Sequence, residues 1–149
     1  MKKIVSVSSF LLFCLAACTN NTEEAPKSEN DVDAVRNFIQ SSLYGDYEKA
    51  KKYMIHDSIN LGLMNTYEER VVLSSDEKRG FASASINIHD VNRPNDSTTI
   101  VIYSNSYKNN WDTLKVIRQN GEWLVDFKYL FNHSMDTLMN PSANKDSIR

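Results

Sequence analysis

The spacing of apolar residues changes once along this chain, at Gly80, and this change limits the folds that the chain can adopt. Before Gly80, apolar residues recur every three or four positions, as on one face of a helix. After Gly80, apolar and polar residues alternate in stretches rich in β-branched and aromatic side chains, as in strands with one buried face. Helices followed by strands predict an α+β domain, with the helices covering one face of a sheet.

Three helices are expected before Gly80. Asn30 or Asp31 can cap the first helix, Gly45 ends it, and Asp46 can cap a second, short helix. The apolar faces consist of Val32, Val35, Phe38, Ile39 and Leu43 in the first helix, of Tyr47, Ala50 and Met54 in the second, and of Ile59, Leu63, Tyr67 and Val71 in a third that starts at Ser58 and ends near Ser74 to Gly80.

Four strands with short connections are expected after Gly80, and they predict an antiparallel meander. They comprise Ala82 to His89, Thr98 to Tyr107, Trp111 to Arg118, and Glu122 to Phe131. Asn120-Gly121 predicts the last hairpin most strongly, because both central positions of a type I′ turn need positive φ. The fourth strand would place Trp123, Val125, Phe127, Tyr129 and Phe131 on one face, which predicts an aromatic core.

The N-terminal segment is typical of an export signal. Lys2 and Lys3 precede an apolar run, Ile4 to Leu15, which is shorter than the roughly 20 residues that span a bilayer. The run ends in Leu15-Ala16-Ala17-Cys18, which resembles the bacterial lipobox, in which the cysteine receives fatty acyl chains such as palmitate and becomes the first residue. A buried N-terminal helix is the alternative, but the polar tract that follows leaves it nothing to pack on.

These signals divide the chain into a signal peptide (1–17), a lipidated Cys18 with a flexible tether (18–30), a folded domain (31–131) and a polar tail (132–149). Cleavage would also discard Cys14, so the mature protein would have no free thiol for catalysis. Thr19 replaces the aspartate that commonly follows the cysteine in inner-membrane lipoproteins. By that resemblance we expect an outer-membrane lipoprotein, anchored in the membrane by its lipid and either periplasmic or surface-exposed.

The folded domain resembles the nuclear transport factor two-like fold, also called cystatin-like, as found in small lipoprotein domains of unknown function from the Bacteroidetes. The resemblance is carried by the first helix with Phe38 and Ile39, by Gly45-Asp46-Tyr47-Glu48-Lys49-Ala50, and by the hairpin from Leu114 to Asp126. It implies a cone in which a curved four-stranded sheet wraps around helices and leaves a pocket at its open end. It implies no single activity, because relatives include isomerases, dehydratases, ligand binders and interaction modules.

The sequence lacks the residues that several classes of function require. A net charge of −2 without a basic patch disfavours nucleic-acid binding. The three histidines, His56, His89 and His133, are scattered without metal-ligand spacing. A phosphate-binding loop, a dinucleotide fingerprint and a nucleophile elbow are all absent from the sequence. We therefore expect neither a cofactor nor a metal, and we assign no catalytic residue.

Five side chains are candidates for a ligand site at the open end of the cone: Trp123, Phe127, Tyr129, Asp90 and Tyr103. The aromatic residues could line the site, although core packing also explains them. Strand parity places Asp90 with Ile86 and Ile88 at a pocket mouth and His89 on the opposite face, while a turn at the strand end explains Asp90 more simply.

Two further aspartates complete the inventory of acids that could serve a site. Asp112 is a candidate base, and Asp126 lies opposite Trp123 and Val125, where it is expected to face solvent.

The first hypothesis for the function is a non-enzymatic module that binds a small apolar ligand or a protein partner. The alternatives are an immunity or inhibitor lipoprotein directed against an extracytoplasmic toxin, and an isomerase- or dehydratase-like enzyme that uses Asp90.

A short motif is repeated more often than composition explains. Five of the eleven aspartates precede Ser or Thr and then an apolar residue or Thr. The triplet resembles the O-glycosylation signal of exported Bacteroidetes proteins, and Ser97, Thr137 and Ser147 are the candidate sites because they lie in expected loops or in the tail. Helix capping and strand edges explain the same triplets equally well.

Overall fold

The computed structural model describes residues 27–132 of the chain. Four helices come first: α1 (Asp31–Leu43), α2 (Tyr47–Lys51), α3 (Ser58–Arg70) and α4 (Ser75–Ala82). Four strands follow: β1 (Ile86–Asn95), β2 (Thr98–Asn105), β3 (Trp111–Gln119) and β4 (Glu122–Asp126). The strands form one antiparallel sheet in the order β1-β2-β3-β4. The predicted α+β architecture with an antiparallel meander is confirmed.

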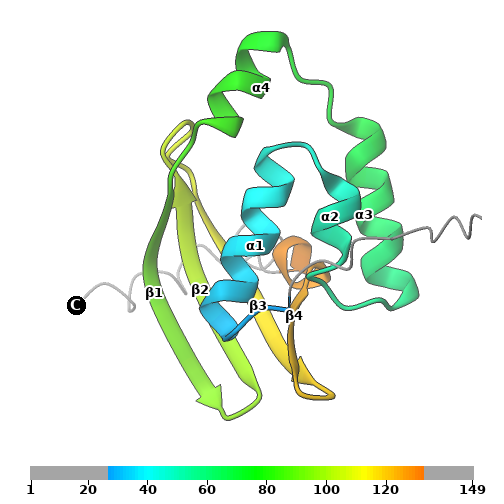
Figure 1. The fold of residues 1–149 in the computed structure, drawn as a ribbon, viewed down its shortest axis with the longest axis vertical. Coiled ribbons are helices and arrows are strands. Elements are labelled where there is room, and N and C mark those ends of the chain that lie inside the picture. The colour runs from blue at the N-terminus through cyan, green and yellow to red at the C-terminus, as the bar shows by residue number, and fades with distance from the viewer. Residues whose placement is uncertain (1–26, 133–149) are drawn as a thin grey trace, which may run out of the picture.

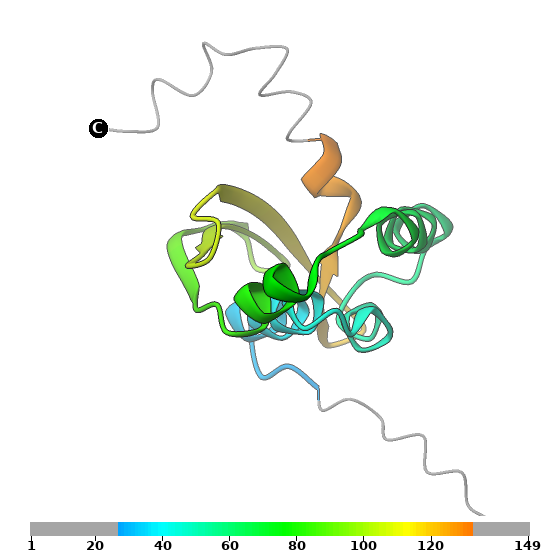
Figure 2. The ribbon, with the colours of Figure 1, turned by 90° about the horizontal axis from the view of Figure 1, so that it is seen from above.

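The sheet curves around α1, which contacts all four strands (Figures 1 and 2). Ala34, Val35, Phe38 and Ile39 of α1 are buried against it, at the spacing of one helical face. Their partners on the sheet include Val101, Leu114, Val116 and Val125, which are fully buried. The domain therefore has one core, between the concave face of the sheet and the helices.

The ends of α1 follow the predicted signals. The side chain of Asn30 accepts a hydrogen bond from the backbone N–H of Asp33 at 2.9 Å, so Asn30 is the cap. Gly45 adopts φ +74°, a left-handed conformation that ends the helix without a side-chain penalty. Asp31 is instead buried, and its role is discussed below.

The segment after α2 protects the edge of the sheet. Asp46 caps α2 as predicted, but Met54 lies beyond the helix and forms a parallel bridge with Val125 of β4. The Val125 N–H donates to Tyr53 O, and the Ile55 N–H donates to Val125 O, both at 2.9 Å. These bonds cover an edge that would otherwise expose unpaired backbone groups.

The third predicted helix is wrong in length and only partly correct in its buried face. α3 ends at Arg70, and a separate helix, α4, begins after a capping box in which Ser74 and Glu77 bond each other's backbone. In α3 the buried side chains are Asn60 and Met64, whereas Ile59 is 59% exposed. The stripe at intervals of four is therefore only partly correct: Leu63 packs against the core and Tyr67 and Val71 face the cavity described below, but Ile59 is exposed and the most buried residues were missed.

β1 begins later than predicted and contains a bulge. Ala82 belongs to α4, because alanine and serine alternation carries little strand preference and the capping box favours a helix. The pairing of β1 with β2 shifts between Ile88 and Asp90, so His89 is the extra residue. The bulge changes the parity of the strand, and the prediction that Asp90 shares a face with Ile88 is wrong: Val91 packs on the core, whereas Asp90 is exposed.

β4 is shorter than predicted. It ends at Asp126, and residues 128–132 form a helical turn, so Tyr129 and Phe131 do not belong to a strand. The turn before β4 is as predicted, with φ +51° at Asn120 and +84° at Gly121. The early end of β4 moves Phe127 off the sheet and toward the helices.

Candidate functional site

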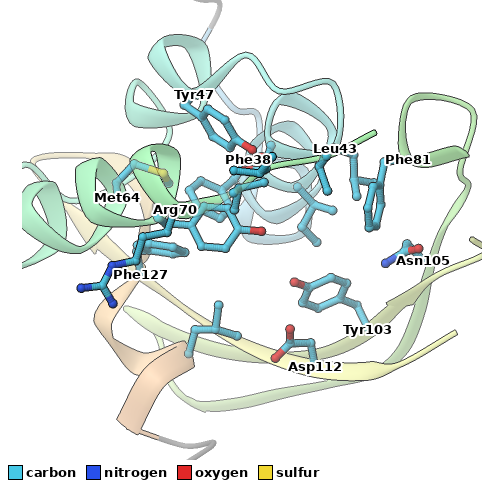
Figure 3. A pocket seen from close by; sticks show the side chains of 17 residues that line it. Phe38, Leu43, Tyr47, Met64, Arg70, Phe81, Tyr103, Asn105, Asp112 and Phe127 are labelled. Carbon is cyan, nitrogen blue, oxygen red and sulfur yellow. Dashed lines mark hydrogen bonds between the residues drawn. The ribbon is translucent and has the colours of Figure 1, made fainter. Parts of the chain in front are cut away.

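A cavity of about 480 Å³ lies between the concave face of the sheet and the helices, in the half of the domain near α4 (Figure 3). It falls within the size range of small-molecule sites. Its lining residues come from α1, α2, α3, α4, the segment that joins α3 to α4, β2, β3, and the chain after β4. Segments distant in the sequence thus build one enclosure.

Aromatic rings make up much of the wall. They belong to Phe38, Tyr47, Tyr67, Phe81, Tyr103 and Phe127. Phe127, only 4% exposed, contacts two of the other rings: its centroid lies 5.5 Å from that of Phe38 and 6.2 Å from that of Tyr67. Tyr47 meets Tyr67 at 5.9 Å and 79°, edge to face. Such pairs stabilise each other by about 0.5–1.5 kcal/mol beyond the area that they bury.

A network around Asp126 holds Phe127 in this position. The Asp126 carboxylate accepts from Lys115 Nζ at 2.8 Å, and from Lys128 Nζ and Asn60 Nδ2 at 3.3 Å. The Lys128 N–H in turn donates to Asn60 Oδ1 at 2.8 Å. Asp126 is 2% exposed, so the prediction that it faces solvent is wrong. It lies opposite Val125 as expected, but Lys115, Lys128 and Asn60 cover it.

The polar groups of the cavity gather on the sheet. Tyr103 of β2 and Asp112 of β3 are cross-strand partners, and both point into the cavity, with Asn105 on the same face of β2 (Figure 3). Asp112 Oδ1 accepts from the Thr113 N–H at 3.0 Å. Burial, followed by the negative charge of Asp112, raises the pKa of Tyr103 far above its usual value. The Tyr103 hydroxyl therefore keeps its proton throughout the physiological pH range and can donate a hydrogen bond.

Tyr67 lies within the field of the same carboxylate. Burial raises the pKa of its hydroxyl, and the charge of Asp112 raises it further. The opposite wall contributes a cation at its rim: Arg70 is exposed, and its guanidinium points away from Tyr103 and Asp112 (Figure 3). The interior is thus apolar and aromatic, with a negative charge on the sheet side.

The segment between α3 and α4 lines the cavity with Val71, Val72 and Leu73. Val72 is 89% exposed, so this part of the wall is in contact with solvent. On the α4 side, Phe81 packs on Tyr107 with ring centroids 4.9 Å apart. A short extended segment and one aromatic contact therefore form the boundary of the cavity at this end.

Two of the five predicted ligand-site residues, Tyr103 and Phe127, line the cavity. Trp123 lies elsewhere against the core, with the Arg118 guanidinium 5.8 Å from its ring. Tyr129 lies on the helical turn after β4, with Lys115 Nζ 5.1 Å from its ring. Asp90 is exposed at the bulge of β1. The structure therefore does not bring these three to the cavity.

Other cavity residues were not among the five. Asp112 was a candidate acid, and its pairing with Tyr103 follows from the hairpin register between β2 and β3. Tyr67 and Tyr47 come from helices, and the sequence places them only on apolar faces. Their approach to the sheet depends on how α2 and α3 pack, which local spacing does not encode.

His89 takes part in a different arrangement on the convex side of the sheet. Its ring stacks on that of Trp111, with centroids 4.1 Å apart and an interplanar angle of 9°, and its Nε2 lies 2.8 Å from Ser104 Oγ.

Within residues 27–132, no group of three or more His, Cys, Asp or Glu side chains could hold a metal ion. In the same part of the chain, no helix is long and apolar enough to cross a membrane.

The sites proposed for covalent modification lie mostly beyond this region. Cys18, Thr137 and Ser147 are outside the described residues. Ser97 lies in the exposed turn between β1 and β2, where its N–H and hydroxyl both donate to Asn95 Oδ1 at 3.0 Å. A glycan at Ser97 remains a prediction.

Comparison of this chain with protein-family models, with curated proteins and with solved structures finds no match.

Proposed function

We propose that this protein is a lipid-anchored binding module of the bacterial cell envelope, that its domain has the nuclear transport factor two-like fold, and that it takes up a small, largely apolar molecule. The cavity carries this proposal: about 480 Å³ of space lined mainly by apolar and aromatic side chains, with a few polar groups on one wall. Small-molecule sites combine these same two features, apolar area for affinity and a few polar groups for orientation.

The alternatives have less support. An isomerase- or dehydratase-like enzyme based on Asp90 would need that carboxylate in the cavity, whereas Asp90 is exposed at the β1 bulge. The immunity or inhibitor hypothesis requires a protein-binding surface. A hollow interior is a weaker basis for a protein partner than for a small ligand, because a protein partner engages the outside of the domain.

Fluorescence of Nile red, a neutral apolar dye, tests the binding function. We expect saturable enhancement with the wild-type protein. Ser42 lines the cavity from α1, so Ser42→Phe would put a ring into the space and weaken dye binding by about tenfold or more. Ser58→Phe, at an exposed position at the start of α3, is the matched control and should bind as wild type does.

Thermal unfolding of both variants by circular dichroism would show whether they are folded. If the dye does not bind to wild-type protein, or binds equally well to folded Ser42→Phe protein, the cavity is not a binding site and the proposal fails.

A further inference from the structure

The ring geometry of the cavity resembles a box rather than a stack. Tyr67 meets Tyr47 at 79° and Phe127 at 84°, so neighbouring rings stand nearly perpendicular to one another. Phe38, tilted by 54° to Phe127, adds a further wall. Rings that meet at steep angles form corners in the cavity wall, whereas parallel stacked rings would form a flat one.

Aromatic walls are not neutral surfaces to a charged guest. The face of each ring carries partial negative charge, and a cation within about 6 Å of a ring centroid is attracted by roughly 0.5–2 kcal/mol, the larger values applying away from water. An anion would meet the same faces with the opposite sign. Because six aromatic side chains line this cavity, the sign of a ligand's charge should influence its affinity.

The Asp112 carboxylate on the sheet also favours a cation over an anion. Asp112 points into the cavity beside Tyr103 (Figure 3), and its charge adds to burial in raising the pKa values of the Tyr103 and Tyr67 hydroxyls. A buried cation needs a nearby opposite charge to offset its loss of hydration, and Asp112 supplies one. The Arg70 guanidinium, which would oppose a cation, is exposed to solvent and directed away from Asp112, so water and salt screen it.

We infer that the cavity selects organic cations: an ammonium group on an apolar body, with the ammonium near Asp112 and the body among the aromatic rings. This inference rests on the proposed binding function and adds the chemical class of the ligand. Neutral molecules of the same shape bind more weakly, and carboxylates bind worst, because Asp112 and the ring faces both repel them.

Three compounds with one shared body provide the test. 3-Phenylpropylamine, 3-phenylpropan-1-ol and 3-phenylpropanoate differ mainly in the charge of their terminal group near pH 7, and each can be titrated against bound Nile red. We expect the amine to displace the dye at a concentration about tenfold below that of the carboxylate, with the alcohol between them.

Asp112→Asn removes the negative charge but keeps the shape of the side chain. In this variant the amine should lose its advantage and displace Nile red at the same concentration as the alcohol. Asp90→Asn makes the same change at the exposed bulge of β1 and should leave the order of the three compounds unchanged.

The outcomes separate this inference from the proposed function. Equal displacement by amine and carboxylate in the wild-type protein would overturn the cation selectivity while the bound dye upholds the cavity as a binding site. Absence of dye binding would overturn both. The wild-type comparison requires no variant, so the inference stays testable even if Asp112→Asn does not fold.

Discussion

At the scale of single residues, one buried carboxylate links the first helix to the sheet. Asp31, at the start of α1, accepts two hydrogen bonds from Arg93 at 2.6 and 3.1 Å and one from Thr99 Oγ1 at 2.6 Å. Burial alone would raise the pKa of Asp31, but the bonds from Arg93, Thr99 and the Val32 N–H outweigh it and lower the pKa below 3.8. The ionised form is therefore the one that stabilises the fold.

We expect Asp31→Asn to destabilise the protein by about 2–3 kcal/mol near pH 7, because it removes a charge that receives several hydrogen bonds. The pKa of this group is lower in the folded than in the unfolded state. Its contribution is therefore complete well above pH 3.8, the unfolded value, and is lost as the pH falls through the lower folded value. Urea unfolding across this pH range should show the gap between wild type and variant narrowing in acid.

Asp33→Asn is the control for this experiment, because Asp33 lies in the same first turn of α1 but its bonds to Glu29 and Asn37 are local. It should cost less than about 1 kcal/mol. A cost for Asp31→Asn no larger than that of the control would contradict the role given to Asp31.

At the scale of elements, α4 is attached to the domain by few contacts. It has no buried residue of its own, and it is held by the Phe81–Tyr107 pair, by the ion pair of Glu77 with Lys108 at 3.7 Å, and by its approach to α1. Gly80 lies directly under the Tyr107 ring, and a Cβ at this position would overlap it. The φ of Gly80 is not in the left-handed region, so its backbone conformation does not require glycine. The close approach of the Tyr107 ring does.

The effect of Gly80→Ala should change sign with the residue at position 107. In the wild-type background the added methyl displaces the Tyr107 ring, and this loss outweighs the helix preference of alanine, for a net destabilisation of about 1 kcal/mol. In a Tyr107→Ala background the space is open, and the same substitution should stabilise by about 0.5–1 kcal/mol. A double-mutant cycle from urea unfolding measures both; additive effects would show that Gly80 and Tyr107 do not interact.

The elements also show which features local sequence encodes. The start of α1, the cap of α2 and the Asn120-Gly121 turn depend on neighbouring residues, and each is where its signal places it. The bulge at His89 arises from pairing with β2, and the burial of Asp126 arises from side chains on α3, β3 and the turn after β4. Such features depend on contacts between segments, so spacing along one segment could not reveal them.

The candidate site likewise combines features that local sequence encodes with features that depend on contacts between segments. Phe127 was predicted from the aromatic face of its strand and Tyr103 as an aromatic residue that could line a ligand site, and both line the cavity. Asp90 was misplaced by a single inserted residue, because one bulge exchanges the two faces of every position beyond it. The predicted strand ends would have placed Tyr107 opposite Trp111, whereas β2 ends at Asn105 and the register pairs Tyr103 with Asp112, so the sequence did not reveal this pair.

At the scale of the whole molecule, the cavity and the first described residues lie at opposite ends of the domain. Lys27, the first described residue, forms an ion pair with Glu122 at 2.5 Å, beside the turn that joins β3 to β4. Tyr103, Asn105 and Asp112 belong to the opposite ends of β2 and β3, and these strand ends lie toward α4 (Figure 1). A tether anchored through Cys18 would therefore hold the domain by the end farther from its cavity and leave the cavity end toward solvent.

This arrangement requires that Cys18 carries the lipid, and the two cysteines of the chain provide a matched pair of variants. Cys18→Ser should prevent labelling of the protein with a palmitate analogue and release it from the membrane fraction, because the apolar contribution of the acyl chains, about 0.8 kcal/mol for each buried CH₂, is lost. Cys14→Ser changes the same atom four residues earlier, within the proposed signal peptide, and should leave labelling and membrane attachment intact. Labelling that persists in Cys18→Ser protein, or that is lost in the Cys14→Ser control, would mean that Cys18 is not the anchor, and the orientation of the cavity away from the bilayer would then lose its basis.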